Sequence, residues 1–218
     1  MQCKAQYTEQ KKWKNFFKLI AEFTMQTLVF VVTTLIQLYI FVLLLRVWMQ
    51  WVRADFYNPF SKFVVKATQP IVAPLRRIIP SFGAIDTASV VVAFVLAIAA
   101  IIFGMWATNL LPILGISILP MGLILLLTYT GKLIFWMILI RAILSWVSQG
   151  RNPVDYLLYQ LTEPLMAPIR RIIPAMGGLD FSAMIVMFIL IALNYLRVDI
   201  SLMIDPSLTA MMYSIGIM

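Results

Sequence analysis

The chain has 218 residues, of which 62% are hydrophobic and only 12% are charged. Its mean hydropathy is +0.95, whereas a soluble domain is about 45–50% apolar and about 25% charged. This composition predicts an integral membrane protein. The net charge of +8 does not indicate nucleic-acid binding, because the basic residues are scattered beside apolar segments, where they suit anionic lipid headgroups and membrane topology. Without histidine and with Cys3 as the single cysteine, the chain offers no usual imidazole metal or haem site and no disulfide framework, so we expect no cofactor.

The first membrane span is predicted from about Thr27 to Leu45, after a polar N-terminal segment of 24 residues that contains five lysines. This apolar run is too long for the core of a signal peptide and has the length of a span. It ends in an aromatic and basic belt typical of a membrane interface: Arg46, Trp48, Trp51 and Arg53.

The five N-terminal lysines favour a cytoplasmic N-terminus, which would place the basic segment 46–86 outside, against the positive-inside rule. We therefore expect that translation starts at Met25, or that residues 1–24 are disordered or lie flat on the membrane surface. An amphipathic helix at the interface is the alternative, because four apolar residues share one face at helical spacing. These are Trp13, Phe16, Phe17 and Ile20.

A short amphipathic helix is predicted after the first span. Asn58 and Pro59 have the residue types of an N-cap and of the first helical position. The apolar residues that follow share one face at the spacing of an interfacial helix, away from Lys62 and Lys66. They are Phe60, Phe63, Val64 and Ala67. We expect this helix to break at Thr68, Pro70 and Pro74, because a proline ring removes a donor and clashes with the carbonyl four residues earlier.

Three further spans are predicted at about Thr87–Trp106, Met121–Ser145 and Phe181–Leu196, with a tight connection near residues 109–112. A second amphipathic helix follows Asn152-Pro153, and its apolar face would contain Val154, Leu157, Leu158 and Leu161. Arg197 would close the fourth span. We expect the apolar tail 198–218, which Asp205-Pro206 interrupts, to lie at the interface.

An internal repeat organises the chain. Residues 58–86 align without a gap with residues 152–180, and thirteen of the twenty-nine pairs are identical. The motif Pro-x-x-x-Pro-x-Arg-Arg-Ile-Ile-Pro starts at Pro70 and again at Pro164. An offset of 95 aligns the preceding helices and pairs Arg46 with Arg141, Trp51 with Trp146 and Thr33 with Thr128.

The predicted fold is an all-α membrane bundle with four transmembrane helices in two parallel repeats, each with an amphipathic, proline-broken segment. The repeats would span residues 25–108 and 121–197, joined by a loop at 109–120. The N-terminal extension 1–24 and the C-terminal tail 198–218 lie outside them.

These residues resemble the YggT (YlmG) family of bacterial membrane proteins, whose unit occurs as a tandem pair. The resemblance covers about residue 25 to the end of the fourth span, not residues 1–24. It rests on Arg46-Val-Trp-Met-Gln-Trp51, Asp55-Phe-Tyr-Asn-Pro59 and the two proline-arginine segments. It implies a small inner-membrane protein linked to osmotic-stress tolerance and to envelope or division processes. Plastid relatives look like assembly factors, one of them for haem attachment to a cytochrome b. The resemblance implies no defined catalytic residues.

Two sets of charged residues in the repeats are candidate functional residues. Arg76, Arg77, Arg170 and Arg171 either set topology and contact anionic headgroups or form a symmetric docking surface for a partner or lipid. Asp86 and Asp180 fit helix N-caps. An ion pair with the arginines of the same repeat, or a cation or proton site, is the alternative, and a cap and an ion pair can coexist.

Lys132 would lie near the bilayer midplane if the third span is 121–145, and Gln37 is its repeat partner. A lysine stem of about 6 Å does not reach an interface about 15 Å away, so a functional intramembrane polar site is one interpretation. A shallower span, or hydrogen bonding to neighbouring helices, is the other. The sequence contains no catalytic histidine, nucleophile elbow or phosphate-binding loop, which argues against an enzyme.

The function expected from the sequence is that of a non-enzymatic inner-membrane factor that organises or assists envelope proteins, with an osmotic-stress phenotype. Its partners would be the anionic bilayer and an unidentified membrane protein. The alternative is a small channel or transporter that uses the broken segments as re-entrant hairpins. Few polar residues are available to line a path for water or solute, which disfavours the alternative.

Overall fold

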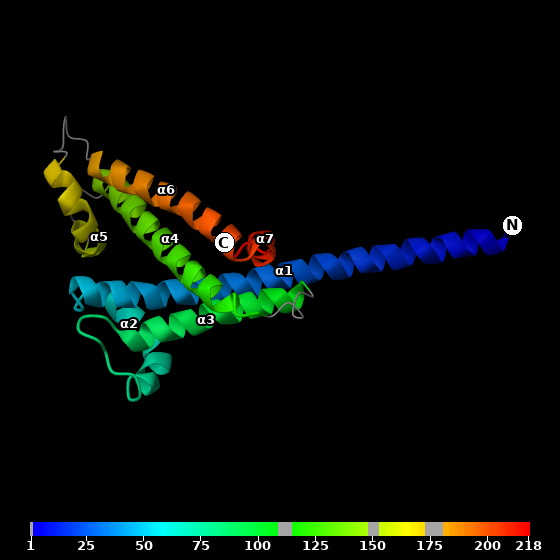
Figure 1. Cartoon of the computed structure of the whole chain (residues 1–218), viewed down its shortest axis with the longest axis horizontal. Coiled ribbons are helices and arrows are strands. Elements are labelled where there is room, and N and C mark those ends of the chain that lie inside the picture. The colour runs from blue at the N-terminus through cyan, green and yellow to red at the C-terminus, as the bar shows by residue number, and fades with distance from the viewer. Residues whose placement is uncertain (1, 109–114, 148–152, 173–180) are drawn as a thin grey trace.

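The computed structural model of residues 1–218 describes all of them except 1, 109–114, 148–152 and 173–180, and the side chains of 2–23, 145–147 and 153. The described residues form helices and no strand (Figure 1). In chain order these are α1 (Gln2–Val52), α2 (Pro59–Leu75), α3 (Thr87–Ala107), α4 (Ile118–Val147), α5 (Pro153–Ile172), α6 (Phe181–Ile204) and α7 (Pro206–Ser214).

Four stretches of these helices are long and apolar enough to span a membrane. They are Thr24–Val52 of α1, all of α3, Ile118–Leu144 of α4 and all of α6. Since a bilayer core of about 30 Å requires about 20 helical residues, each can cross it once. The all-α fold with four apolar spans is therefore confirmed.

Each repeat is a pair of spans joined by a shorter helix. In Figure 1, α1 packs along α3 and α4 packs along α6, while α3 and α4 join the two pairs. The short helices α2 and α5 lie at the same end of the molecule, where α1 and α4 end. Small residues on α3, including Ala93, Ala97 and Ala100, are buried and permit close approach of its neighbours.

Two apolar cores divide the bundle between them. The first lies around α1, α3, the beginning of α4 and α7, with Leu43, Ala97 and Met212 fully buried. The second lies around the end of α1, the second half of α4, α5 and the beginning of α6, with Met49, Ile138 and Leu161 buried. The second core therefore ties the end of the first repeat to the second repeat.

The expected breaks at the prolines are wrong. Helix α2 continues through Pro70 and Pro74, and α5 continues through Pro164 and Pro168. Pro70 and Pro74 are exposed and lie one turn apart on the same side of α2. Each proline lacks a backbone N–H, so the carbonyl four residues earlier has no helical donor. These carbonyls belong to the exposed side of α2, where water or lipid headgroups can donate to them, so the helix need not end. Within residues 59–75 and 153–172, each segment is therefore one continuous helix without a hairpin turn.

The predicted apolar faces of α5 and α2 differ in how far the bundle covers them. Leu157, Leu158 and Leu161 of α5 are buried. The buried face of α2 contains Ser61, Val64, Thr68 and Val72, whereas Phe60 is 42% and Phe63 63% exposed. The two phenylalanines therefore point away from the bundle. The predicted N-cap is confirmed, because the Asn58 side chain accepts a hydrogen bond from the backbone N–H of Phe60 at 2.9 Å.

Both ends of the chain also differ from expectation. Residues 2–23 are helical and continue directly into the first span, rather than being disordered. Helix α6 runs past Arg197 to Ile204, and the Arg197 guanidinium donates to the side-chain oxygen Oδ1 of Asn194 one turn earlier. The tail after Ile204 forms α7, which packs into the first core through Leu208 and Met212.

Candidate functional site

Arg46 forms the centre of a polar cluster at the end of the first span. It is only 2% exposed. Its Nη1 donates to Thr68 Oγ1 at 2.6 Å, and its Nη2 donates to Gln69 Oε1 at 3.2 Å. Its Nε lies 3.3 Å from Asp86 Oδ2. One arginine of α1 therefore contacts both α2 and the start of α3. The sequence-based interpretation of Arg46 as part of an interfacial belt missed this.

Asp86 pairs with a second arginine from the same repeat. Arg76 Nε donates to Asp86 Oδ1 at 3.1 Å and Arg76 Nη2 to Oδ2 at 2.5 Å, while Ser89 Oγ donates to Oδ2 at 2.7 Å. Asp86 occupies the N-cap position of α3, but its side chain makes no capping hydrogen bond. The ion-pair interpretation of Asp86 is thus confirmed and side-chain capping is wrong.

The electrostatics keep the Asp86 carboxylate charged. Burial alone would raise the pKa of Asp86. Hydrogen bonds from Arg76 and Ser89, together with the charges of Arg76 and Arg46, outweigh burial and lower that pKa below its usual value. The carboxylate therefore serves two guanidinium groups at once, and removing it would leave Arg46 buried beside Arg76 without a counter-charge.

Arg141 forms the equivalent cluster in the second repeat. Its Nη1 donates to Thr162 Oγ1 at 2.5 Å and to Met166 Sδ at 3.0 Å, and its Nη2 lies 3.6 Å from Glu163 Oε2. The guanidinium also lies 4.8 Å from the centroid of the Tyr159 ring. Arg170 Nη1 donates to Glu163 Oε1 at 3.2 Å.

The two clusters follow one plan with one exchange. In both, a threonine hydroxyl donates to the carbonyl four residues earlier, at 2.8 Å for Thr68 and 2.7 Å for Thr162, and so presents its oxygen to the arginine. The next residue is Gln69 in the first repeat and Glu163 in the second. Among the described residues, Asp86 pairs with Arg46 and Arg76 in the first repeat, and Glu163 pairs with Arg141 and Arg170 in the second. Asp180, the repeat partner of Asp86, lies outside the described residues.

The double arginines divide between inward and outward roles. Arg76 and Arg170, the first of each pair, bond an acid of their own repeat. Arg77 and Arg171, the second of each pair, are exposed. The sequence singled out all four arginines as one set, whereas the structure separates them into two that form ion pairs and two exposed charges.

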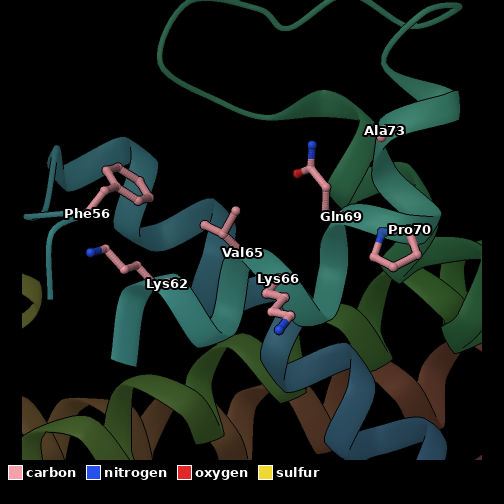
Figure 2. A pocket seen from close by; sticks show the side chains of 7 residues that line it. All are labelled: Phe56, Lys62, Val65, Lys66, Gln69, Pro70 and Ala73. Carbon is pink, nitrogen blue, oxygen red and sulfur yellow. The ribbon is translucent and has the colours of Figure 1, made fainter. Parts of the chain in front are cut away.

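A shallow hollow of about 540 Å³ lies on the outer side of α2 (Figure 2). Lys62 and Lys66 of α2 line this hollow together with apolar side chains. The lining residues are Phe56, Lys62, Val65, Lys66, Gln69, Pro70 and Ala73. In the second repeat, Lys62 and Lys66 are replaced by Tyr156 and Gln160. The basic hollow therefore belongs to the first repeat.

Gln37 of α1 and Lys132 of α4 are the two intramembrane polar residues that the sequence singled out. Both are half-buried. The hydroxyls of Thr33 and Thr128, one turn from each, donate to carbonyls of their own helices at 2.8 and 2.7 Å. Lys132 Nζ lies 5.8 Å from the centroid of the Tyr129 ring. Lys132 lines a groove between α4 and α6.

A signal for both arginine clusters is present in the sequence. The offsets of 95 and 94 pair Arg46 with Arg141 and Thr68 with Thr162 as identical residues. Contacts also join the repeats: the Trp48 indole N–H donates to the Leu161 carbonyl at 2.9 Å. Within the described part of the chain, no group of three or more His, Cys, Asp or Glu side chains could hold a metal ion.

The fold and the duplicated cluster define a membrane protein built from two copies of a three-helix unit, each of which contains an arginine that bonds its short helix. The family model CCB3/YggT matches residues 25–107 and 120–201, one match for each repeat. The chain belongs to the CCB3/YggT family.

Relatives in several bacteria are similar over most of their length. "Uncharacterized protein YggT" of Escherichia coli strain K12 is 55% identical over 170 residues, which are 78% of this chain and 88% of the relative. "Uncharacterized protein in proC 3'region" of Vibrio alginolyticus is 52% identical over 177 residues, 81% of this chain and 96% of the relative. "Uncharacterized protein PA0392" of Pseudomonas aeruginosa is 40% identical over 161 residues, 71% and 79% of the two chains. No solved structure matches this chain.

Proposed function

We propose that the protein is a non-enzymatic factor of the bacterial inner membrane that organises or assists other membrane proteins, and that its loss sensitises cells to osmotic stress. The observation that carries this proposal is the pair of arginine clusters at one end of the bundle. Each fixes a short helix against its spans and leaves one arginine, Arg77 or Arg171, exposed beside it. A rigid, duplicated basic surface suits docking rather than turnover.

The bilayer is the first partner of this surface. Lys62 and Lys66 stand over the apolar hollow of Figure 2, an arrangement that suits an anionic phospholipid, with its phosphate on the lysines and its chains on the apolar side chains. A basic residue near an anionic leaflet contributes about 1 kcal/mol of membrane attraction. By the positive-inside rule this end lies at the cytoplasmic face. The same surface is then available to cytoplasmic parts of membrane proteins.

The test compares the exposed arginines Arg77 and Arg171 with Arg76 and Arg170, which form ion pairs within their repeats. We expect Arg77→Glu with Arg171→Glu to give a protein that accumulates normally but fails to complement a deletion strain under osmotic shock. We expect Arg76→Glu with Arg170→Glu to lower abundance instead, because each reversal replaces a counter-charge by a second carboxylate beside Asp86 or Glu163. Arg53→Glu, at an exposed arginine outside the aligned segments 58–86 and 152–180, is the control. Full complementation by the outward double variant would reduce these arginines to topology signals.

A further inference from the structure

A groove of about 700 Å³ opens between α4 and α6 on the side of the second repeat. Its walls are mostly apolar, with Leu127 and Phe135 from α4 and Leu190 and Leu193 from α6. Helix α6 is the least covered of the four spans, with 17% of its most apolar window buried, against 28% to 50% for the others. Because the groove has apolar walls and lies beside an exposed helix, it can receive another membrane-spanning helix.

Lys132 lies in this groove at the middle of the third span. The span runs from Ile118 to Leu144, which places Lys132 about 21 Å from one end and about 18 Å from the other at 1.5 Å per residue. A lysine stem of about 6 Å does not reach either interface. A charged side chain at this depth is found facing a bundle interior or a partner group, since hydrocarbon does not solvate it.

The groove contains a second cation and, among the described side chains that line it, no acid. Arg197 lines the groove one to two turns nearer the α7 end and bonds Asn194 Oδ1 and the Tyr213 hydroxyl, both neutral acceptors. Its Nη1 is buried and has no hydrogen-bond partner among the described residues. The ion pairs of Asp86 and Glu163 lie in the arginine clusters at the end of the bundle. The groove therefore presents two positive charges within apolar walls.

The depth of Lys132 limits what can supply the negative charge. A phospholipid headgroup stays at the interface, about 15 Å from the midplane. A second copy of this chain offers no acid at that depth, because its acidic residues in the four spans are confined to the final turns of α6, at Asp199. A carboxylate carried at the middle of another protein's transmembrane helix reaches Lys132 directly.

We propose that the groove between α4 and α6 binds a transmembrane helix of a different membrane protein, which carries an aspartate or glutamate near the bilayer midplane. That carboxylate pairs with Lys132, a polar group of the same helix bonds Arg197, and apolar residues fill the rest of the groove. This inference rests on the proposed function, because it names the class of partner that the protein assists, and it assigns the contact to the membrane interior rather than to the basic end.

The experiment uses the full chain in native membranes with a photoreactive amino acid at Leu193, which lines the groove and is 53% exposed. The matched control position is Leu35 on α1, which is 61% exposed but lies outside the groove. We expect a protein adduct from position 193 and none of the same mass from position 35. Mass spectrometry of the adduct should map the crosslink to a transmembrane segment with an acid near its centre.

Variants at Lys132 then test the chemistry of the contact. We expect Lys132→Met to reduce the adduct at least tenfold without lowering abundance, since it removes a charge from the membrane interior, and Lys132→Arg to retain it. Lys132→Asp should lose the adduct and regain it when the acid of the identified helix is replaced by lysine. This charge exchange is a result that a merely structural role of Lys132 would not give.

Four outcomes would overturn the inference. They are an adduct with a second copy of this chain, an adduct with phospholipid alone, a crosslinked segment without an acid, and an adduct indifferent to Lys132→Met. The proposed function is judged separately by the Arg77 and Arg171 variants. Osmotic failure of those variants with no Lys132-dependent adduct would reject the groove as the partner site and leave the proposed function standing.

Discussion

Arg46 places a permanent charge in the packed end of the first span, where Asp86 provides a full counter-charge 3.3 Å away. Thr68 and Gln69 add neutral oxygens. A buried ion pair adds little net stability compared with an apolar core, but removing one of its partners is strongly destabilising. The cluster therefore acts as a fixed joint between α1, α2 and α3, which is stable only while Asp86 is ionised.

Asp86→Asn should destabilise the folded protein by about 3–5 kcal/mol, because Arg46 and Arg76 lose their shared carboxylate. Thermal unfolding in detergent measures the effect. Asp199→Asn, at an exposed aspartate of α6, is the control and should change stability by no more than about 0.5 kcal/mol. An unchanged melting temperature for Asp86→Asn would mean that the arginines find other acceptors.

The same variant tests the pH dependence. The pKa of Asp86 is lower in the folded than in the unfolded state, so the ionised carboxylate favours folding at pH values above its usual pKa of 3.8. That contribution weakens below pH 3.8 and is lost as the pH falls through the lowered pKa. The stability difference between the wild type and Asp86→Asn should therefore shrink on acidification in that range and not at neutral pH.

For single residues, the sequence predicts which of them belong to the arginine clusters but not which hydrogen bonds they make. The gapless alignment marks Thr68 and Thr162 as identical partners. Arg46 and Thr68 are 22 positions apart, and their contact depends on how α2 folds back against α1. A basic residue beside tryptophans is typical of an interface, so the local pattern favoured the wrong environment for Arg46.

At the scale of elements, packing decides which helices continue and where they lie. Proline rules predicted breaks in α2 and α5, but both helices continue because their other faces are anchored in the cores and by the arginine clusters. The sequence predicted an interfacial position for the tail 198–218, because Asp205-Pro206 interrupts it. Asp205 accepts hydrogen bonds from the backbone N–H groups of Ser207 and Leu208 and one from the Ser117 hydroxyl, which fixes the start of α7 against the start of α4.

Gly104 of α3 marks the place where α7 approaches α3. A Cβ atom at this position would overlap the Ile215 side chain and would lie 3.1 Å from Met211 Sδ. We expect Gly104→Leu to displace the tail and to destabilise the protein by about 1–3 kcal/mol, as overpacking does. Thermal unfolding of Gly104→Leu with and without Ile215→Ala measures this, and the second change should recover part of the loss.

Gly131→Ala is the matched control for this packing prediction, because nothing lies within 4 Å of a Cβ atom at Gly131. It should leave stability equal or slightly higher, since alanine is the better helix former by about 1 kcal/mol. Equal melting temperatures for Gly104→Leu and Gly131→Ala would show that α7 does not pack on α3.

At the scale of the whole molecule, the two sets of basic residues lie at opposite ends of α1. The continuous helix from Gln2 to Val52 places the N-terminal lysines at one end and the arginine clusters, α2 and α5 at the other (Figure 1). The positive-inside rule counts basic residues near span ends, so the two sets compete for the cytoplasmic face. Segments 46–86 and 141–180 together contain ten Lys and Arg residues, against five ahead of the first span.

The larger set should prevail, which predicts that the end with α2 and α5 is cytoplasmic and that the connection between α3 and α4 is outside. Single cysteines in a Cys3→Ser background test this at Ser81 and Ile116, both exposed and on opposite sides of the bilayer in this topology. An impermeant thiol reagent on intact cells should label position 116, and should label position 81 only after lysis. Labelling of position 81 but not 116 in intact cells would show that the N-terminal lysines set the orientation, and would place Arg77 and Arg171 outside, away from any cytoplasmic partner.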